Sequence, residues 1–256
     1  MFSLKETTFV FYFDSSMELK NTYFNWSTGK DASLALYYLM QNEALNVSKL
    51  VTSINNYHDR VSMHGLRREL LERQAESVGL PLTTIELPQE PSMEEYAVIM
   101  EKTVADLKSQ NYTDCGFGDI HLEDLREYRE KQLASHEITC HFPLWKRDSK
   151  EIIEDFIRLG FKAVVVCIKS ELLDESFVGR EIDESFINDL PENVDPCGEN
   201  GEFHTFCYDG PIFSKAIDFH IGENVLREYN RPKGDDDHPD APSKVGFWFC
   251  DLVPKQ

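Results

Sequence analysis

The chain has 256 residues, a net charge of −20 and a pI near 4.7, and 41% of its residues are hydrophobic. This length permits one large domain or two modest ones around a buried core. The charge disfavours nucleic acid as the main partner without excluding tRNA, because phosphate backbones are bound by clustered Lys and Arg and the sequence shows no basic stripe.

Residues 1–16 carry no chemistry that the sequence identifies, and Met17 stands just before the first convincing strand. We therefore expect residues 1–16 to be an extension or a misplaced start. After them, β-rich runs alternate with amphipathic helices. The expected strands are 20–26, 48–55, 82–87, 112–118 and 137–142, and the expected helices are 30–43, 62–78, 92–109 and 121–135. Helices of this length between strands imply a parallel sheet that is covered on both faces.

The alternation continues after Asp148 with a helix and the strand FKAVVVCI. Further along, the pattern changes to acidic loops, a short helix near 181–190 and several β runs. ENVLREY and KVGFWFCDL are expected to pair as a hairpin across the solvated loop NRPKGDDDHPDAPSK. Pro143 is the expected boundary between an ATP-binding domain, 17–143, and a C-terminal substrate domain, 144–256.

The six cysteines lie far apart and form no CxxC pair, so neither a zinc ribbon nor a thioredoxin-type redox site is indicated. Several stand in apolar runs, as Cys167 does in VVVCI, which is typical of small core residues. Reduced thiols predict a cytoplasmic protein. No apolar run approaches the roughly 20 residues that a membrane span requires.

The stretch FNWSTGKDASLALYYL places a short polar turn between a strand and a helix. Ligands of open α/β sheets bind at this edge, and free N–H groups and the helix dipole favour a phosphate there. Gly29 lets the backbone come close, and Ser27 and Thr28 add hydroxyl groups. Lys30 adds a positive charge, and Asp31 would cap the helix or help to hold a metal ion. The turn is not a Walker A loop, and its residues alone are equally compatible with an ordinary helix cap followed by surface charges.

A second polar stretch, DPCGENGEFHTFCYDGPIF, precedes an apolar strand near the end of the chain. It holds Glu199, Asn200, Glu202 and His204 within six positions. A period of two would put Glu202 and His204 on one face of a strand. The stretch is either a polar turn leading into a strand or, as this density of titratable groups favours, a site of proton transfer.

Both stretches resemble known sequences. STGKDAS is similar to the Ser-Gly-Gly-x-Asp-Ser pyrophosphate loop of ATP-pyrophosphatase enzymes, with Thr28 in place of a Gly and Ala32 in place of the final Ser. Together with FGDIHLEDLRE and GENGEFHTFCYDGPIF it resembles the diphthine–ammonia ligase family, particularly its bacterial-type members. RVSMHGLRRELLERQAESVGLPL and SELLDESFVGREID add to the resemblance, which runs from about Met17 to Phe219.

The resemblance implies a Rossmann-like (adenine nucleotide alpha hydrolase-like) parallel-sheet domain followed by a smaller α+β C-terminal domain. The implied activity is ATP- and Mg²⁺-dependent amidation by ammonia of the diphthine carboxylate on elongation factor 2, with release of AMP and pyrophosphate. A bacterial source would require another acid substrate. No membrane is implied, and nucleic acid stays an unlikely partner.

The resemblance also implies site residues. In the turn, Lys30 would neutralise the phosphates. Asn55 would contact adenine or ribose from the end of its strand, and Asp119 would lie on the ligand rim unless it caps the next helix. The implied nucleotide-binding set is Ser27, Thr28, Gly29, Lys30, Asp31, Ser33, Asn55 and Asp119.

The implied catalytic set is Glu202, His204, Glu199 and Asn200. Glu202 and His204 would accept the proton of ammonium, for which a base with a pKa near 7 is suited. Glu199 would bind magnesium or position the substrate. His64 and Arg67 either contact ligand or are solvated. Arg126 either reaches the same rim as Asp119 or, as we favour, pairs with Glu123 or Glu130 on its own helix.

Two other functions stay open. A tRNA-modifying ATP pyrophosphatase would call for basic patches and often for paired catalytic cysteines, neither of which the sequence has. A nucleotide-binding sensor without turnover would keep STGKD but would not need GENGEFHT, and Ala32 is the feature that favours it.

Overall fold

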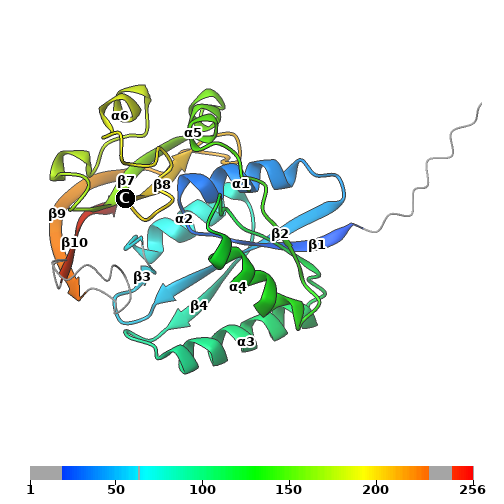
Figure 1. Ribbon diagram of the computed structural model, residues 1–256. Helices are drawn as coiled ribbons and strands as arrows, with labels where there is room; N and C mark the ends of the chain where they lie inside the picture. The colour runs from blue at the N-terminus through cyan, green and yellow to red at the C-terminus, as the bar shows by residue number, and fades with distance from the viewer. Residues whose placement is uncertain (1–18, 63, 231–243, 256) are drawn as a thin grey trace, which may run out of the picture.

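The computed structural model describes residues 19–62, 64–230 and 244–255. Two β-sheets organise these residues, with helices between them and on the outer face of the first sheet (Figure 1). The predicted residues 1–16 and most of the loop between the last two strands lie outside the described residues.

The first sheet is built from the N-terminal half of the chain and is mostly parallel. Its strands run in the order β3-β2-β1-β5-β6, and β4 also pairs with β2. Only β3 is antiparallel to its neighbour β2 among these pairs. The strands are β1 (Lys20–Asn25), β2 (Leu45–Asn55), β3 (Arg60–Val61), β4 (Leu82–Leu87), β5 (Asp114–Gly116) and β6 (Thr139–His141). The predicted parallel sheet is confirmed.

Helices connect these strands, and local sequence fixes several of their ends. Gly79 ends α2 in the left-handed conformation, Ser92 starts α3 with a capping box, and the Asp148 side chain caps α5. The helices are α1 (Lys30–Met40), α2 (Arg68–Val78), α3 (Met93–Ser109), α4 (Glu123–Ala134), α5 (Ser149–Arg158) and α6 (Glu184–Asp189), with a short 3₁₀ turn at Glu175–Phe177.

The second sheet belongs to the C-terminal half and is antiparallel. Its order is β8-β7-β10-β9. The strands are β7 (Lys162–Lys169), β8 (Phe203–Asp209), β9 (Phe219–Asn230) and β10 (Lys244–Pro254). The pairing of β9 with β10 confirms the predicted hairpin. The α/β fold with a second, mixed unit is therefore confirmed, whereas the boundary at Pro143 stays a prediction.

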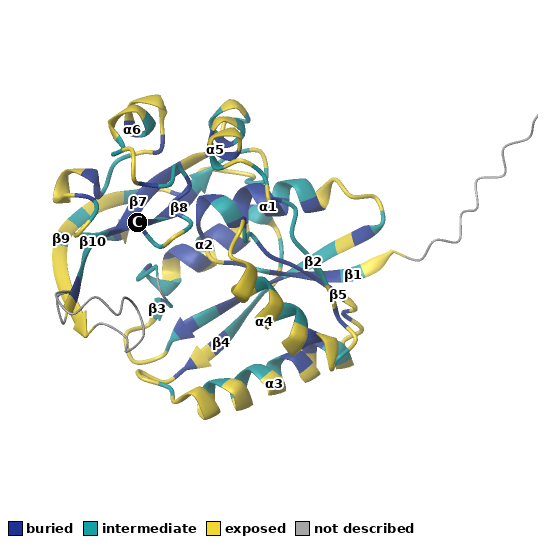
Figure 2. Cartoon of the chain, in the orientation of Figure 1, coloured by how far each residue is buried: buried dark blue, intermediate teal, exposed yellow. Residues whose placement is uncertain are grey.

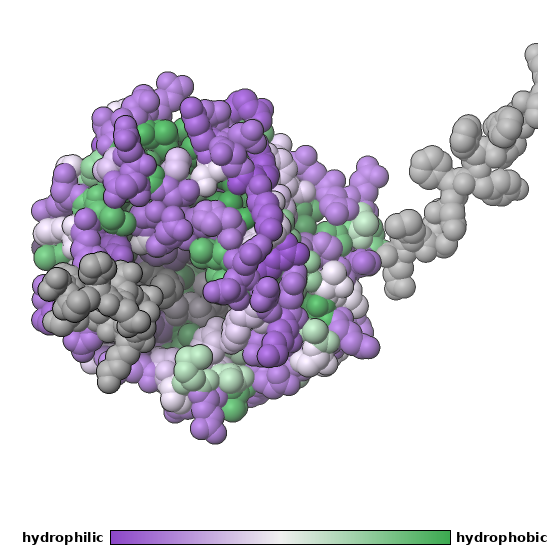
Figure 3. Space-filling view, in the orientation of Figure 1, coloured by the Kyte–Doolittle hydropathy of each residue, from purple (hydrophilic) through white to green (hydrophobic). Residues whose placement is uncertain are grey.

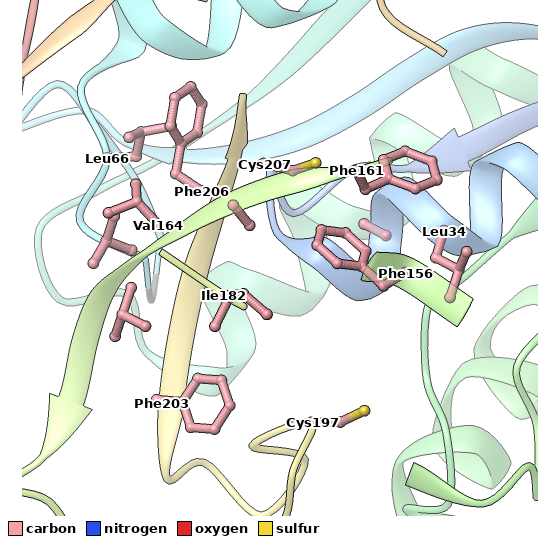
Figure 4. Close-up of a cluster of buried hydrophobic side chains, with 14 of the residues drawn as sticks. Leu34, Leu66, Phe156, Phe161, Val164, Ile182, Cys197, Phe203, Phe206 and Cys207 are labelled. Carbon is pink, nitrogen blue, oxygen red and sulfur yellow. The ribbon is translucent and has the colours of Figure 1, made fainter. Parts of the chain in front are cut away.

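Two apolar clusters hold the layers together. The larger one joins α1 and α2 to the inner face of the second sheet, so that these helices lie between the two sheets (Figures 1 and 2). Leu34 of α1, Phe156 of α5 and Phe206 of β8 belong to it (Figure 4). The smaller cluster packs α3 and α4 against the other face of the first sheet. Both halves of the chain therefore share one core, and the C-terminal half can reach the edge of the first sheet.

The second predicted helix begins later than expected. Residues 60–61 pair with the end of β2 as β3, and α2 starts only at Arg68. Ser62 and His64 therefore lie in a loop. The predicted strand at 112–118 is also shorter, because only Asp114–Gly116 pairs with its neighbours.

Other expectations about the whole chain can be compared with the structure. All six cysteines are free, and five are buried, as expected of core residues. Among the helices described, none is both long enough and apolar enough to span a bilayer. The cytoplasmic location stays a prediction.

Candidate active site

A cavity of about 810 Å³ opens where β1, β2 and β5 end and where α1 begins. The C-terminal half closes it with the segment that leads into β8. The surface is largely hydrophilic on the face drawn in Figure 3, which is hollowed near its centre. The predicted site residues that line the cavity are Ser27, Gly29, Lys30, Asp31, Asp119, Glu199, Asn200 and His204. The two polar stretches, far apart in sequence, therefore share one cavity.

The turn after β1 packs tightly against the second sheet. Gly29 is the N-cap of α1, and a Cβ there would lie 3.1 Å from His64 Cε1 and 3.3 Å from the Thr205 carbonyl oxygen. A larger residue would therefore push the turn away from β8. Thr28 precedes Gly29 with φ +75°, a left-handed conformation that β-branched residues rarely adopt. The turn is thus held in an unfavourable local conformation by its surroundings.

Lys30 lies inside the cavity wall and not on the surface. Its side chain is 3% exposed, and Nζ donates to the Asp31 carboxylate at 2.7 and 2.9 Å and to the Cys197 carbonyl. Burial opposes the charge on Lys30, but Asp31, Cys197 and Glu199 together outweigh it, so the pKa of Lys30 is raised. Its backbone N–H donates to Thr205 Oγ1 at 3.0 Å. A permanent positive charge therefore stands at the N-terminus of α1, where the helix dipole adds to it.

Glu202 is hydrogen-bonded within its own segment, and its role as a proton acceptor stays a prediction. Its carboxylate is buried and accepts from the backbone N–H groups of Asp195 and Asn200, at 3.1 and 2.8 Å, and from Asn200 Nδ2 at 3.0 Å. It precedes β8, so it does not share a strand face with His204, and it is not part of the cavity lining described. Glu202 instead fixes the turn that carries Glu199 and Asn200.

Glu199 does face the cavity. Its Oε1 accepts from the backbone N–H of Ile120 at 2.8 Å, which ties the segment to the loop after β5. Burial raises the pKa of Glu199 to about 7, against the effect of the Ile120 hydrogen bond. A carboxyl group with this pKa exchanges protons near neutral pH, which is the property that the sequence had led us to expect of its neighbours.

His204 lines the cavity beside His64, which comes from the loop after β3. The two rings are stacked, with centroids 4.9 Å apart. His64 Nδ1 donates to the Thr205 carbonyl at 3.2 Å, since a carbonyl can only accept. Burial, together with Lys30, lowers the pKa of His204 to about 4, and burial with His204 lowers that of His64 to about 3. The pKa of His204 therefore lies below the value near 7 that suits a base for ammonium, and both rings are neutral at pH 7.

Asp119 reaches the cavity rim from the loop after β5, but it is paired. Its carboxylate lies 2.8 Å from Arg129 Nε, an ion pair with α4 that the sequence did not suggest. Arg126 pairs with Glu130 at 2.8 Å, as predicted. A Cβ on Gly118 would lie 2.9 Å from the Ala32 backbone nitrogen, so this loop can approach α1 closely only because of the glycine.

Three predicted nucleotide contacts lie outside the cavity lining described. Thr28 is buried, Ser33 Oγ donates to the Gly29 carbonyl at 2.9 Å, and Asn55 donates to the Gln89 carbonyl at 3.1 Å. Ser33 and Asn55 are thus already engaged with the backbone, and the contact of these three residues with a nucleotide stays a prediction. The sequence missed Gln74 of α2, which is fully buried behind the turn. Its place in the apolar stripe of α2, four residues after Leu70, was a signal that could have revealed it.

The carboxylates at the cavity do not form a metal site of their own. Within residues 19–62, 64–230 and 244–255, no group of three or more His, Cys, Asp or Glu is arranged to hold a metal ion. Asp31 and Asp119 are each engaged by a cation, Lys30 and Arg129 respectively. Mg²⁺ commonly binds through one or two carboxylates together with substrate phosphates, and the site fits that pattern better than a dedicated metal centre.

Comparison with known proteins identifies the family. Residues 20–134 match the diphthamide synthase N-terminal domain, and residues 148–233 match the diphthamide synthase C-terminal domain. The chain belongs to the diphthamide synthase family. Both of its polar stretches fall inside the matched residues, the turn in the N-terminal match and the Glu199 segment in the C-terminal one.

Members of this family with curated names are moderately similar to the chain. It is 29% identical over 188 residues to a diphthine–ammonia ligase from Danio rerio, a match that covers 68% of this chain and 70% of that protein. It is 30% identical over 88 residues to the diphthine–ammonia ligase of Homo sapiens, covering 32% of this chain and 33% of the human protein. In the latter match the chain thus spans about a third of the relative's length.

Two solved structures are weakly similar to the chain. A predicted subunit of tRNA methyltransferase from Methanocaldococcus jannaschii is 16% identical with a TM-score of 0.39, over 56% of this chain and 80% of that chain. A U34-tRNA thiolase from Methanococcus maripaludis is 16% identical with a TM-score of 0.34, over 55% and 57%. At these values neither likeness bears on the function of this chain.

Proposed function

We propose that the protein is an ATP-dependent amide ligase, which adenylates a carboxylate, transfers ammonia to it and releases AMP and pyrophosphate. The observation that carries this proposal is the meeting of the Lys30 turn and the Glu199–His204 segment in one cavity. Family membership supports an ATP-pyrophosphatase type of function. The first stretch suits a polyphosphate and the second suits proton transfer, so one site offers both parts of the reaction.

The turn suits the phosphates of ATP. Gly29 and Lys30 line the cavity at the start of α1, where the helix dipole and unpaired N–H groups attract anions. Lys30 Nζ adds a full charge, and Ser27 adds a hydroxyl group. Because pyrophosphate leaves with much negative charge, such pre-positioned groups would contribute most of the rate enhancement.

Magnesium would enter with the triphosphate, held by phosphate oxygens and by the Asp31 carboxylate. Asp31 is the best protein ligand, since it lies in the lining next to Lys30 and its side chain is 25% exposed. When bound, the ion would neutralise charge that builds up on the phosphates. Lys30 and the N-terminus of α1 would neutralise part of the same phosphate charge.

The rest of the cavity is apolar enough to hold the adenine base. Val51 and Ile85 come from the ends of β2 and β4, and the helices α3 and α4 add further side chains. A base stacked among them would place its phosphates towards the turn. The apolar lining residues on this side are Val51, Ile85, Tyr96, Met100, Phe117, Leu122 and Leu125.

The acid and ammonia would meet at the other end of the cavity. We propose the diphthine carboxylate of elongation factor 2 as the acid, because the curated relatives are named diphthine–ammonia ligases. His204 is neutral before ATP binds, and the triphosphate would raise its pKa by adding negative charge nearby. His204 would then accept a proton from ammonium, so that the ammonia released attacks the acyl adenylate and AMP leaves, while Glu199 and Asn200 position the acid.

The products of turnover test the reaction. Incubation with ATP, magnesium, ammonium and the diphthine form of elongation factor 2 should give AMP, pyrophosphate and amidated protein. Chromatography that finds ADP and phosphate would overturn the proposal. ATP binding without any turnover would support the nucleotide sensor instead, and turnover that requires tRNA would support a tRNA-modifying enzyme.

A variant separates the second step from nucleotide binding. His204→Gln should keep the ATP dissociation constant within about twofold, because His204 belongs to β8 and not to the turn, yet it should lower amide formation by about a hundredfold or more. The matched control is His58→Gln, which changes an exposed histidine outside the cavity lining described. Unchanged amide formation in His204→Gln would remove His204 from the proton-transfer step.

A further inference from the structure

Gln74 is a fully buried polar side chain behind the phosphate-binding turn. Its Oε1 accepts from Trp26 Nε1 at 2.6 Å, and its Nε2 donates to the Thr28 carbonyl at 3.0 Å and to the Cys207 carbonyl at 2.6 Å. The orientation of the amide is unambiguous, because an indole N–H only donates and carbonyl groups only accept. One side chain of α2 thus links the end of β1, the turn and β8.

The contact with Thr28 fixes a peptide group in an unfavourable conformation. Thr28 has φ +75°, and its carbonyl oxygen accepts a second hydrogen bond, from the Cys207 N–H at 2.9 Å. A β-branched residue does not keep this φ without such support. Gln74 and Cys207 together therefore hold the Thr28 carbonyl on the side of the turn that faces α2 and β8.

The direction of that carbonyl sets the direction of the next N–H. In a trans peptide the C=O and N–H groups point to opposite sides, and the described residues contain no cis peptide bond. The Gly29 N–H therefore points away from Gln74, and Gly29 lines the cavity. Its one acceptor within the described chain is Ser27 Oγ, at a long 3.5 Å. This N–H is available to an anion.

We propose that Gln74 is a positioning residue, which orients the Thr28–Gly29 peptide so that the Gly29 N–H binds a phosphate of ATP. The inference rests on the proposed function, because it takes the turn to be the phosphate-binding element. Gln74 acts through the peptide and does not touch the nucleotide. Without it, the Thr28 peptide can rotate, and the N–H group is lost from the site.

The test compares two buried polar residues of α2. Gln74→Met keeps the side-chain length but removes all three hydrogen bonds, and it should raise the ATP dissociation constant about tenfold. Ser77→Ala is the matched control. Ser77 is also buried and also ties α2 to the C-terminal half, through the Lys215 backbone, but it does not reach the turn. Its dissociation constant should stay within about twofold of the wild type.

A rescue separates positioning from a general loss of stability. Glycine adopts positive φ without strain, so Thr28→Gly in the Gln74→Met background should recover at least half of the lost affinity on a logarithmic scale. Gln74→Met and Ser77→Ala should both melt at a lower temperature than the wild type, which a merely structural role of Gln74 would also predict. Only a positioning role predicts that Gln74→Met alone loses affinity and that glycine restores it.

Calorimetry with ATP and magnesium decides between the outcomes. Three results would each overturn the inference while leaving the proposed function in place. They are an unchanged ATP affinity in Gln74→Met, an equal loss of ATP affinity in Gln74→Met and Ser77→Ala, and no rescue by Thr28→Gly. Wild-type protein that binds no ATP would overturn both. If Gln74→Met does not fold, Gln74→Glu replaces it, because the carboxylate keeps the Trp26 acceptor but loses both donors; it should show the same loss and rescue.

Discussion

The turn between β1 and α1 and the segment from Gly198 to His204 reach the same cavity from opposite halves of the chain, but they are stabilised differently. The turn is held from behind by other elements, through Gln74 and Thr205. The segment is held largely by its own carboxylates, above all by Glu202.

The two regions also present opposite chemistry to the cavity. The turn presents the charge of Lys30 and the N-terminus of a helix, which attract anions. The segment presents Glu199, with a pKa of about 7, and a neutral His204. The turn therefore carries a fixed charge, whereas the segment carries one group, Glu199, that changes its protonation state near neutral pH.

The largest effect is expected at the centre of the turn. Lys30→Met removes a charge-assisted contact to phosphate at nearly constant volume, which should weaken ATP binding by about 2–3 kcal/mol, or roughly a hundredfold. Calorimetry measures the change. The control is Lys150→Met, on the exposed surface of α5, which should leave ATP affinity unchanged. Equal affinities for Lys30→Met and the wild type would mean that the turn is not the phosphate site.

The next effect concerns the stability of the segment. Glu202→Gln replaces a carboxylate that accepts from three donors, so at least one N–H is left unsatisfied, and the free energy of unfolding should fall by about 1–3 kcal/mol. Glu199→Gln keeps an acceptor for the Ile120 N–H and should cost less. Denaturant unfolding at pH 7 measures both. A greater loss in Glu199→Gln would reverse the division of roles between the two residues.

How far the sequence predicts this architecture depends on the range of the interactions. The alternation of strands and helices is a local pattern, and it placed the turn at the carboxyl edge of the sheet correctly. The expectation that Glu202 and His204 share one strand face was wrong, because positive φ at Gly198 and Gly201 winds the chain into a turn and β8 begins only at Phe203. Gln74 was missed because its partners come from three distant segments.

A pH series should separate His204 from Glu199 by the sign of their effects. The folded-state pKa of His204, about 4, lies below its ordinary 6.5, so the wild type loses stability as the pH falls through this interval. The folded-state pKa of Glu199, about 7, lies above its ordinary 4.5. The contribution of Glu199 to stability is therefore present below pH 4.5 and is lost as the pH rises to about 7.

Single variants isolate each contribution. His204→Gln should flatten the loss of stability between pH 6.5 and 4, and Glu199→Gln should steepen it, because the opposing contribution is removed. The free energy of unfolding measured from pH 4 to 8 tests both. Parallel curves for the wild type and either variant would show that the residue concerned does not titrate differently in the folded state.

The smallest expected effect is a gain in ATP affinity from a substitution at the turn. Ala32 lines the cavity in the first turn of α1, at the position where the related pyrophosphate loops have a serine. Ala32→Ser adds one hydroxyl donor, worth about 0.5–1.5 kcal/mol if it reaches a phosphate, so ATP affinity should rise about twofold to tenfold.

The neighbouring Ser33 is the matched position for a control, because its hydroxyl is buried and already donates to the Gly29 carbonyl. Ser33→Ala should therefore lower stability and leave affinity within about twofold. If Ala32→Ser leaves affinity unchanged, phosphate lies beyond reach of this position, and Lys30 and the Gly29 N–H carry the binding without it.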